Sequence, residues 1–205
     1  LLLCDWSQAF DRTDPQALSD ALIAYGIGGT FLQAIKSTFS AKFRVLGTRG
    51  FPYSPLYPQE VGIRQGCPLP PYLFMLVMTL MFHDIDREVG PQIKQGLLQG
   101  FDLSEILYAD DTLLVLTDGD KTNTLLQAIE RESAYYGLRL NKRKCNVVDM
   151  NGNDVIKLSD GTELDKVEST EYLGGIMHVG INNKVEISSR IAATMPIMFA
   201  LNHFW

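Results

Sequence analysis

The feature that most constrains the fold is a pair of adjacent carboxylates between two apolar runs. Leu107-Tyr108-Ala109-Asp110-Asp111 leads directly into Thr112-Leu113-Leu114-Val115-Leu116. Two short apolar runs joined at a residue type that tolerates turn geometry indicate a β-hairpin. Carboxylates held side by side repel each other unless a cation lies beside them. The sequence therefore predicts a hairpin whose tip meets either a divalent metal ion or a basic partner.

A third aspartate follows the first apolar run. Leu1-Leu2-Leu3-Cys4 is typical of a strand buried on both faces, and Asp5 comes directly after it. If this strand neighbours the hairpin, Asp5, Asp110 and Asp111 converge. Hard oxygen ligands select Mg²⁺ or Mn²⁺, and two such ions about 3.5–4 Å apart can activate a 3′-hydroxyl and hold a leaving pyrophosphate. The alternative is that Asp5 caps a helix and the pair is an exposed turn.

The first half of the chain predicts three helices. Asp14-Pro15 starts the first, which runs to about residue 25. A second is expected over 30–40, and a long, deeply buried one over 71–89. Residues 42–46 predict a half-exposed strand whose two cations, Lys42 and Arg44, face either a phosphate backbone or solvent. The second helix is expected to bury four side chains, Phe31, Ala34, Ile35 and Phe39.

The second half is dominated by hairpins. An amphipathic helix over 122–136 ends at Gly137. Hairpins are expected at Asp160-Gly161 and over 171–177, and a last helix begins near residue 184. The sequence thus predicts an α+β fold, a mostly antiparallel sheet with helices packed on one face.

Bulk properties narrow the function classes. The formal net charge of −6 argues mildly against a self-sufficient nucleic-acid-binding domain, but leaves room for a local basic groove. The three cysteines, Cys4, Cys67 and Cys145, have no zinc or disulfide spacing, so we expect buried or half-buried thiols in a reducing, intracellular compartment, either nucleus or cytoplasm. The longest apolar run, 69–82, is shorter than the about 20 residues of a membrane span.

Five motifs, in order, resemble those of reverse transcriptases. Leu107 to Asp111 resembles the signature hairpin, and Asp5 to Asp11 the first palm motif. The other three are Gly62-Ile63-Arg64-Gln65-Gly66-Cys67-Pro68-Leu69, Gly137-Leu138-Arg139-Leu140-Asn141 with Lys144, and Tyr172-Leu173-Gly174. The Arg-Gln-Gly-Cys-Pro form is similar to the template-and-nucleotide motif of the non-LTR (LINE-type) retrotransposon enzymes.

The resemblance implies a domain organisation. Residues 1–182 would form a polymerase palm with a hairpin primer grip, and 14–60 would include part of the fingers–palm junction. Residues 183–205 would start a helical thumb. Basic fingers motifs, the rest of the thumb and an endonuclease domain are expected in a longer chain of which this is a piece.

It also implies an RNA-directed DNA polymerase acting on an RNA template, a DNA primer and dNTP. Asp5, Asp110 and Asp111 would hold two Mg²⁺ or Mn²⁺ ions, with the Trp6 carbonyl as a further ligand. Phe10 would exclude a 2′-hydroxyl, or else simply pack in the core. The remaining roles concern the substrates: Gln65 and Gly66 on the template and nascent base pair, Lys144 on the nucleotide or else merely at the surface, and Tyr172, Leu173 and Gly174 as the primer grip.

One departure from the motifs keeps other functions open. Pro70 stands where the resembling enzymes have Ser after Cys-Pro-Leu, which removes a hydroxyl. We expect little or no polymerase activity from this stretch alone. The alternatives are a degenerate or domesticated palm that binds nucleic acid without catalysis, and an RNA-dependent RNA polymerase, against which Phe10 argues.

Overall fold

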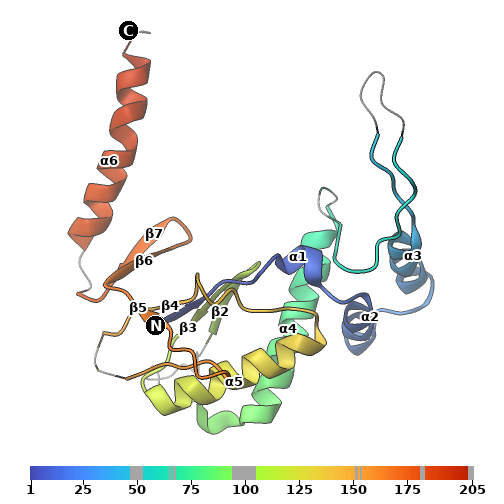
Figure 1. The fold of residues 1–205 in the computed structure, drawn as a ribbon, viewed down its shortest axis with the longest axis horizontal. Helices are drawn as coiled ribbons and strands as arrows, with labels where there is room; N and C mark the ends of the chain where they lie inside the picture. Colours follow the sequence, from blue (N-terminus) through green and yellow to red (C-terminus); the bar gives the residue numbers. More distant parts are fainter. Residues whose placement is uncertain are drawn as a thin grey trace.

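The computed structural model describes residues 1–46, 53–64, 66, 68–93, 105–150, 152, 154–180 and 183–202. Its centre is a five-stranded sheet in the order β2-β3-β1-β4-β5 (Figure 1). The strands are β1 (Leu2–Cys4), β2 (Glu105–Tyr108), β3 (Asp111–Leu114), β4 (Asn146–Val147) and β5 (Asp165–Lys166). The pairs β2–β3, β3–β1 and β1–β4 are antiparallel, whereas β4–β5 is parallel. The α+β class is confirmed, and the sheet is mixed.

The helices lie mainly to one side of this sheet. They are α1 (Ala9–Arg12), α2 (Pro15–Ala24), α3 (Gly29–Ser40), α4 (Pro70–Val89), α5 (Gly119–Tyr135) and α6 (Asn183–Leu201), with a 3₁₀ turn at Pro91–Ile93. Figure 1 shows α4 and α5 crossing below the strands. Their apolar faces meet the sheet in one core, because Phe74, Met81, Leu126 and Leu114 are all fully buried within it.

The capping residues in the sequence predicted most helix ends correctly. Asp14 caps α2 by accepting from the backbone N–H groups of Gln16 and Ala17, and Asp118 caps α5 through Lys121. The α5 helix ends at Tyr135, and Gly137, two residues further on, has a φ of +76°. The Leu138 N–H donates to the Ser133 carbonyl over 2.9 Å, which completes a Schellman cap.

Two burial expectations were wrong. In α3 only Ile35 is buried, and Phe31 is 51% exposed, because α3 packs mainly against α2 and most of its surface lies in solvent. Leu32 and Phe39 are partly buried against the core. In the first half of α4, Tyr72 and Met75 are 63% and 55% exposed, because the helix meets the core with one face. Buried Cys4 and Cys145 confirm the expectation for two thiols, and Cys67 lies outside the described residues.

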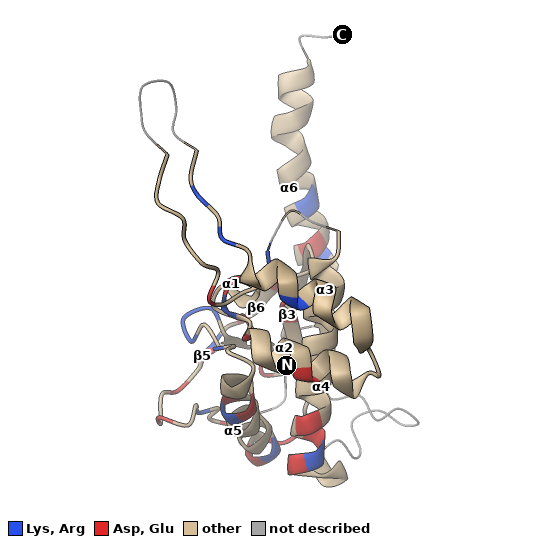
Figure 2. Ribbon diagram, turned by 90° about the vertical axis from the view of Figure 1, so that its right-hand side faces the viewer, with Lys and Arg blue, Asp and Glu red and all other residues tan. Residues whose placement is uncertain are grey.

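Two elements project from the same side of the body. A second, two-stranded sheet of β6 (Ser169–Tyr172) and β7 (Gly175–His178) leads into α6, which points away from the rest and buries none of its described side chains (Figure 1). Beyond α3, residues 41–46 and 53–59 form an extended arm. Figure 2 shows charged residues of both signs gathered on α5 and the end of α4. Within the described residues, no helix has both the length and the apolarity to cross a membrane.

Candidate active site

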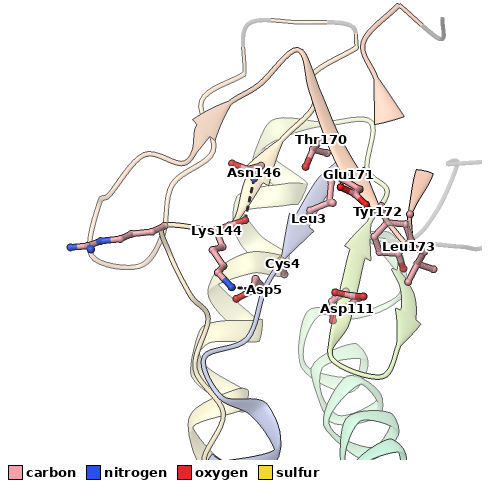
Figure 3. Close-up of a pocket in the computed structure, with 13 residues that line it drawn as sticks. Leu3, Cys4, Asp5, Asp111, Lys144, Asn146, Thr170, Glu171, Tyr172 and Leu173 are labelled. Carbon is pink, nitrogen blue, oxygen red and sulfur yellow. Dashed lines mark hydrogen bonds and ion pairs between the residues drawn. The ribbon is translucent and has the colours of Figure 1, made fainter. Parts of the chain in front are cut away.

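The sheet register places Asp5 beside Asp111. In the β1–β3 pair, Leu3 lies opposite Leu113 and Cys4 opposite Thr112. The next residue of each strand along this antiparallel register is Asp5 on one side and Asp111 on the other. Both line one cavity of about 580 Å³, and Figure 3 shows their carboxylates at the same end of the two strands. The predicted neighbourhood of Asp5 and the hairpin is confirmed.

A tight turn presents the paired carboxylates. Tyr108 lies opposite Asp111, so Ala109 and Asp110 alone make the turn, and Asp111 is the first residue of β3. Ala109 has a φ of +54°, a left-handed conformation that costs a residue with a side chain about 1–2 kcal/mol. Both aspartates are exposed, but only Asp111 lines the cavity, and Asp110 lies at the tip of the turn.

The electrostatics show a crowded set of acids with one lysine close by. The pKa of Asp111 is raised, first by partial desolvation and then by the charges of Asp110 and Asp5. The Lys144 Nζ lies 3.6 Å from an Asp5 carboxylate oxygen (Figure 3). In this structure the cation beside the acids is therefore an ammonium group.

The carboxylate oxygens are suitable ligands for a divalent ion, but the three aspartates are not all close enough together to bind one. Asp5 and Asp111 offer hard carboxylate oxygens to a single cavity, as Mg²⁺ requires. Yet nowhere in the described ranges, which include all three aspartates, do three or more His, Cys, Asp or Glu residues form a group that could hold a metal ion. The third carboxylate, Asp110, would have to turn inward to complete the set.

Neutralising Asp111 should stabilise the fold. The raised pKa means that the folded chain binds the Asp111 proton more tightly than the unfolded chain does. Ionisation of Asp111 therefore lowers the free energy of unfolding at pH values above the folded pKa. It has no effect below the unfolded pKa of about 3.9, where the carboxyl is protonated in both states. Asp111→Asn should therefore raise Tm at pH 7 by about 1–3 °C, after allowance for solvent screening. The gain should vanish near pH 3. Thermal unfolding at both pH values measures it, with the exposed Asp165→Asn as control. A lower Tm for Asp111→Asn at pH 7 would contradict the argument.

The segment that begins at Gly137 positions Asp5. The Asn141 N–H donates to the Asp5 carbonyl over 2.7 Å, and the Ser7 N–H donates to Arg139 over 2.8 Å. These bonds bring Lys144 to the cavity. The resemblance predicted a nucleotide role for Lys144. The bracing of Asp5 has no signal in the sequence, because it rests on main-chain groups.

Trp6 ties the first motif to β3 through its side chain. Its indole N–H donates to the Thr112 hydroxyl over 3.0 Å, and both residues are buried. Trp6 does not line the cavity. The structure thus gives the indole a bracing role that the sequence reasoning missed, and the carbonyl as a metal ligand stays a prediction.

The Gly62 motif packs against the first palm motif. The ring of Phe10 stacks on Phe74, with centroids 4.4 Å apart and the planes at 25°, so part of its role is core packing. The Ile63 N–H donates to the Phe10 carbonyl over 2.6 Å. A Cβ on Gly62 would lie 2.6 Å from the Asp11 carbonyl oxygen, so this close approach requires glycine. Gly66 is exposed away from this contact, and the predicted template contact Gln65 lies outside the described residues.

The three residues of the expected primer grip gather at the same cavity. Tyr172 ends β6, and Leu173 and Gly174 form the turn to β7 with φ values of +50° and +75°. All three line the cavity with Asp5 and Asp111, as Figure 3 shows for the first two. The pKa of the Tyr172 phenol is raised by burial and by the charge of Asp111. Five further polar lining residues were not predicted: Thr112, Arg143, Asn146, Thr170 and Glu171.

The sequence was compared with those of known protein families. Residues 1–177 match the family model described as reverse transcriptase (RNA-dependent DNA polymerase). The chain belongs to this reverse transcriptase family. Its homology to the Pol proteins of non-LTR retrotransposons is distant, and it matches the retrovirus-related Pol polyprotein from the type-2 retrotransposable element R2DM of Drosophila melanogaster at 28% identity over 150 residues. That alignment covers 72% of this chain and 13% of the fly protein.

Other relatives extend the comparison. The transposon TX1 uncharacterized 149 kDa protein of Xenopus laevis is 31% identical over 120 residues, which are 57% of this chain and 9% of that protein. The chain thus spans a small part of the curated relatives. Apo telomerase from Candida tropicalis has a TM-score of 0.63 at 16% identity, with 87% of this chain and 33% of that chain covered. Telomerase from Candida albicans scores 0.64 at 17%, with 86% and 30% covered. The telomerase matches show a shared fold.

Proposed function

We propose that this chain is the catalytic palm of an RNA-directed DNA polymerase that serves retrotransposition. The reaction would join dNTP to a primer 3′-hydroxyl on an RNA template. One observation carries the proposal: Asp5, Asp111, Lys144 and the 172–174 turn, distant in sequence, line a single cavity. In this assignment residues 1–182 are the palm, 14–60 include part of the fingers–palm junction, and 183–205 begin the thumb.

In this proposal the residues that line the cavity, together with others of the same motifs, have separate roles. Asp5, Asp110 and Asp111 would hold two Mg²⁺ or Mn²⁺ ions, together with the Trp6 carbonyl. Such a pair of ions lowers the pKa of the attacking hydroxyl and neutralises the leaving pyrophosphate. Lys144 would leave Asp5 for the nucleotide phosphates and give a proton to the leaving oxygen. Phe10, with Gln65 and Gly66, would fit the sugar and base pair, and Tyr172, Leu173 and Gly174 would hold the primer terminus.

Removing the Lys144 ammonium should strengthen metal binding. This group competes with a divalent ion for Asp5, and exposed ion pairs contribute up to about 1 kcal/mol. Lys144→Met should therefore lower the Kd of the chain for Mn²⁺ about two- to fivefold, measured by electron paramagnetic resonance titration of free Mn²⁺. Lys142→Met is the matched control, because Lys142 pairs with Asp160 instead. Equal Mn²⁺ affinity in wild type and Lys144→Met would count against the competition.

A specific observation also favours a second function. Lys144 already neutralises Asp5, and the described acids form no group ready for a metal. Pro70 moreover replaces the serine of the resembling motif. These features would be expected of a degenerate palm that binds nucleic acid without catalysis.

One assay separates the candidates. The longer protein that carries this chain is given a DNA primer on an RNA template, labelled nucleotide and Mg²⁺ or Mn²⁺. We expect metal-dependent incorporation of dNTP far above that of rNTP, and little or none from residues 1–205 alone. Binding of the primer–template without incorporation in either metal would favour the degenerate palm. Equal use of rNTP would indicate an RNA-dependent RNA polymerase.

A further inference from the structure

We infer that the arm formed by residues 41–46 and 53–59 binds the single-stranded RNA template ahead of the active site. This inference rests on the proposed function and adds a binding surface to it. The arm extends from the body next to α3 (Figure 1).

The arm is a paired, anchored element. Phe43 and Tyr57 exchange two backbone hydrogen bonds of 2.9 and 2.8 Å. At the root, the Arg64 guanidinium donates to the Ala41 carbonyl over 2.9 Å and to the Gln59 side chain over 2.5 Å. These backbone and Arg64 hydrogen bonds hold the arm in place and do not involve the exposed aromatic rings.

The aromatic rings of the arm are exposed to solvent, although those of Phe43 and Tyr57 also contact each other, with centroids 6.3 Å apart. Phe43, Tyr53 and Tyr57 are 48%, 64% and 47% exposed. The Arg44 guanidinium lies 5.9 Å from the Tyr53 ring centroid, as in a cation–π pair. The exposed apolar side chains Val45, Leu46 and Leu56 extend the same surface. Exposed aromatic rings with an interleaved cation are what unpaired bases stack on.

Charge selects the partner. The chain carries a net charge of −6, yet the arm contains Lys42 and Arg44 and no Asp or Glu. Figure 2 shows Lys and Arg segments on one side of the arm, well above the Asp and Glu segments of α4 and α5. A polyanion is favoured over an acidic protein surface. A duplex hides the faces of its bases, so the fitting form is a single strand.

Position selects the template. The arm root joins the first palm motif, because Ile63 next to Arg64 donates to Phe10. A second cavity of about 560 Å³, lined by Phe43, Arg64 and Asp11 among others, lies between the arm and that motif. The primer-grip hairpin lies on the other side of β1 (Figure 1). If that hairpin holds the primer duplex, the strand that continues past Asp5 toward the arm is the uncopied template.

The test measures binding of a fluorescent, unstructured RNA of about 12 nucleotides to the 205-residue chain by anisotropy, without metal or dNTP. Tyr53→Ala should weaken binding about 5- to 100-fold, because one stacked base contributes about 1–3 kcal/mol. Tyr53→Phe keeps the ring and should stay within about twofold. Tyr53 suits this test because its ring lies beside the Arg44 guanidinium. The backbone hydrogen bonds between Phe43 and Tyr57 do not depend on that ring. Tyr135→Ala, a 59% exposed tyrosine on α5, controls for loss of a surface ring.

The outcomes are distinct. Equal RNA affinity of Tyr53→Ala and wild type would overturn the inference while leaving polymerase activity of the longer protein untouched. Loss of chain self-association in Tyr53→Ala, with RNA binding unchanged, would also overturn it and make the arm a protein interface. If Tyr53→Ala weakens RNA binding but the longer protein never incorporates nucleotide, the arm keeps its RNA contact and the proposed function fails.

Discussion

Asp110→Ala and Asp111→Asn should each lower dNTP incorporation by the longer protein at least about 10³-fold. Each change removes one negative charge from a site that must gather two divalent ions, and the ions supply several kcal/mol of transition-state stabilisation. Single-turnover primer extension on an RNA template measures the loss. Asp165→Asn, an exposed aspartate on β5, should remain within about twofold of wild type.

This experiment separates chemistry from folding. Asp111→Asn is expected to be as stable as wild type or more so, because the carboxylate it replaces is partly desolvated and is also repelled by Asp110 and Asp5. A loss of activity in a stable variant cannot then be assigned to unfolding. If Asp110→Ala retains more than about a tenth of wild-type incorporation, Asp110 is not a catalytic residue. The metal ions would then be held by Asp5 and Asp111, the two aspartates that line the cavity.

The features that could be predicted from sequence are local ones. The Asp14 cap, the Gly137 cap and the Asp110 turn each depend on a few consecutive residues, so their chemistry can be read directly. The pairing of β1 with β3 could be stated from the sequence only as a condition, because an apolar run such as Leu1–Cys4 indicates a central strand without identifying its neighbour. The expected burial of this strand on both faces is only partly met, since Leu3 is half-buried and lines the cavity.

What could not be predicted depends on contacts between distant main-chain groups. The bond from Asn141 to the Asp5 carbonyl brings Lys144 to the acids, and no side-chain pattern encodes it. The Trp6 indole bond to Thr112 spans 106 positions and required the sheet register. The exposure of Phe31 depends on how few elements surround α3, a property of the whole arrangement and not of the helix's own periodicity.

Gly137→Ala should destabilise the chain by about 2–4 kcal/mol, a large share of the about 5–15 kcal/mol typical of a folded domain. Two costs add. The φ of +76° is strained for any residue with a side chain, and an added Cβ would lie 2.4 Å from the Arg12 carbonyl oxygen and 3.0 Å from the Asp14 backbone nitrogen. The Asp14 N–H donates to the Tyr136 carbonyl over 3.0 Å, so the clash would fall where two segments of the chain are joined by a hydrogen bond. Urea unfolding followed by circular dichroism measures the change.

Gly161→Ala measures the first cost, the strained φ, without the clash. Gly161 has a similar φ of +81°, but an added Cβ there would meet nothing within 4 Å. Its substitution should cost about 1 kcal/mol, since only the backbone conformation is penalised and the unfolded chain also loses freedom. The difference between the two variants is then the free energy of the close approach between residues 12–14 and the start of the Lys144 segment. Equal losses in both would mean that Gly137 serves only as a helix cap, and that the contact bracing Asp5 does not depend on this crossing.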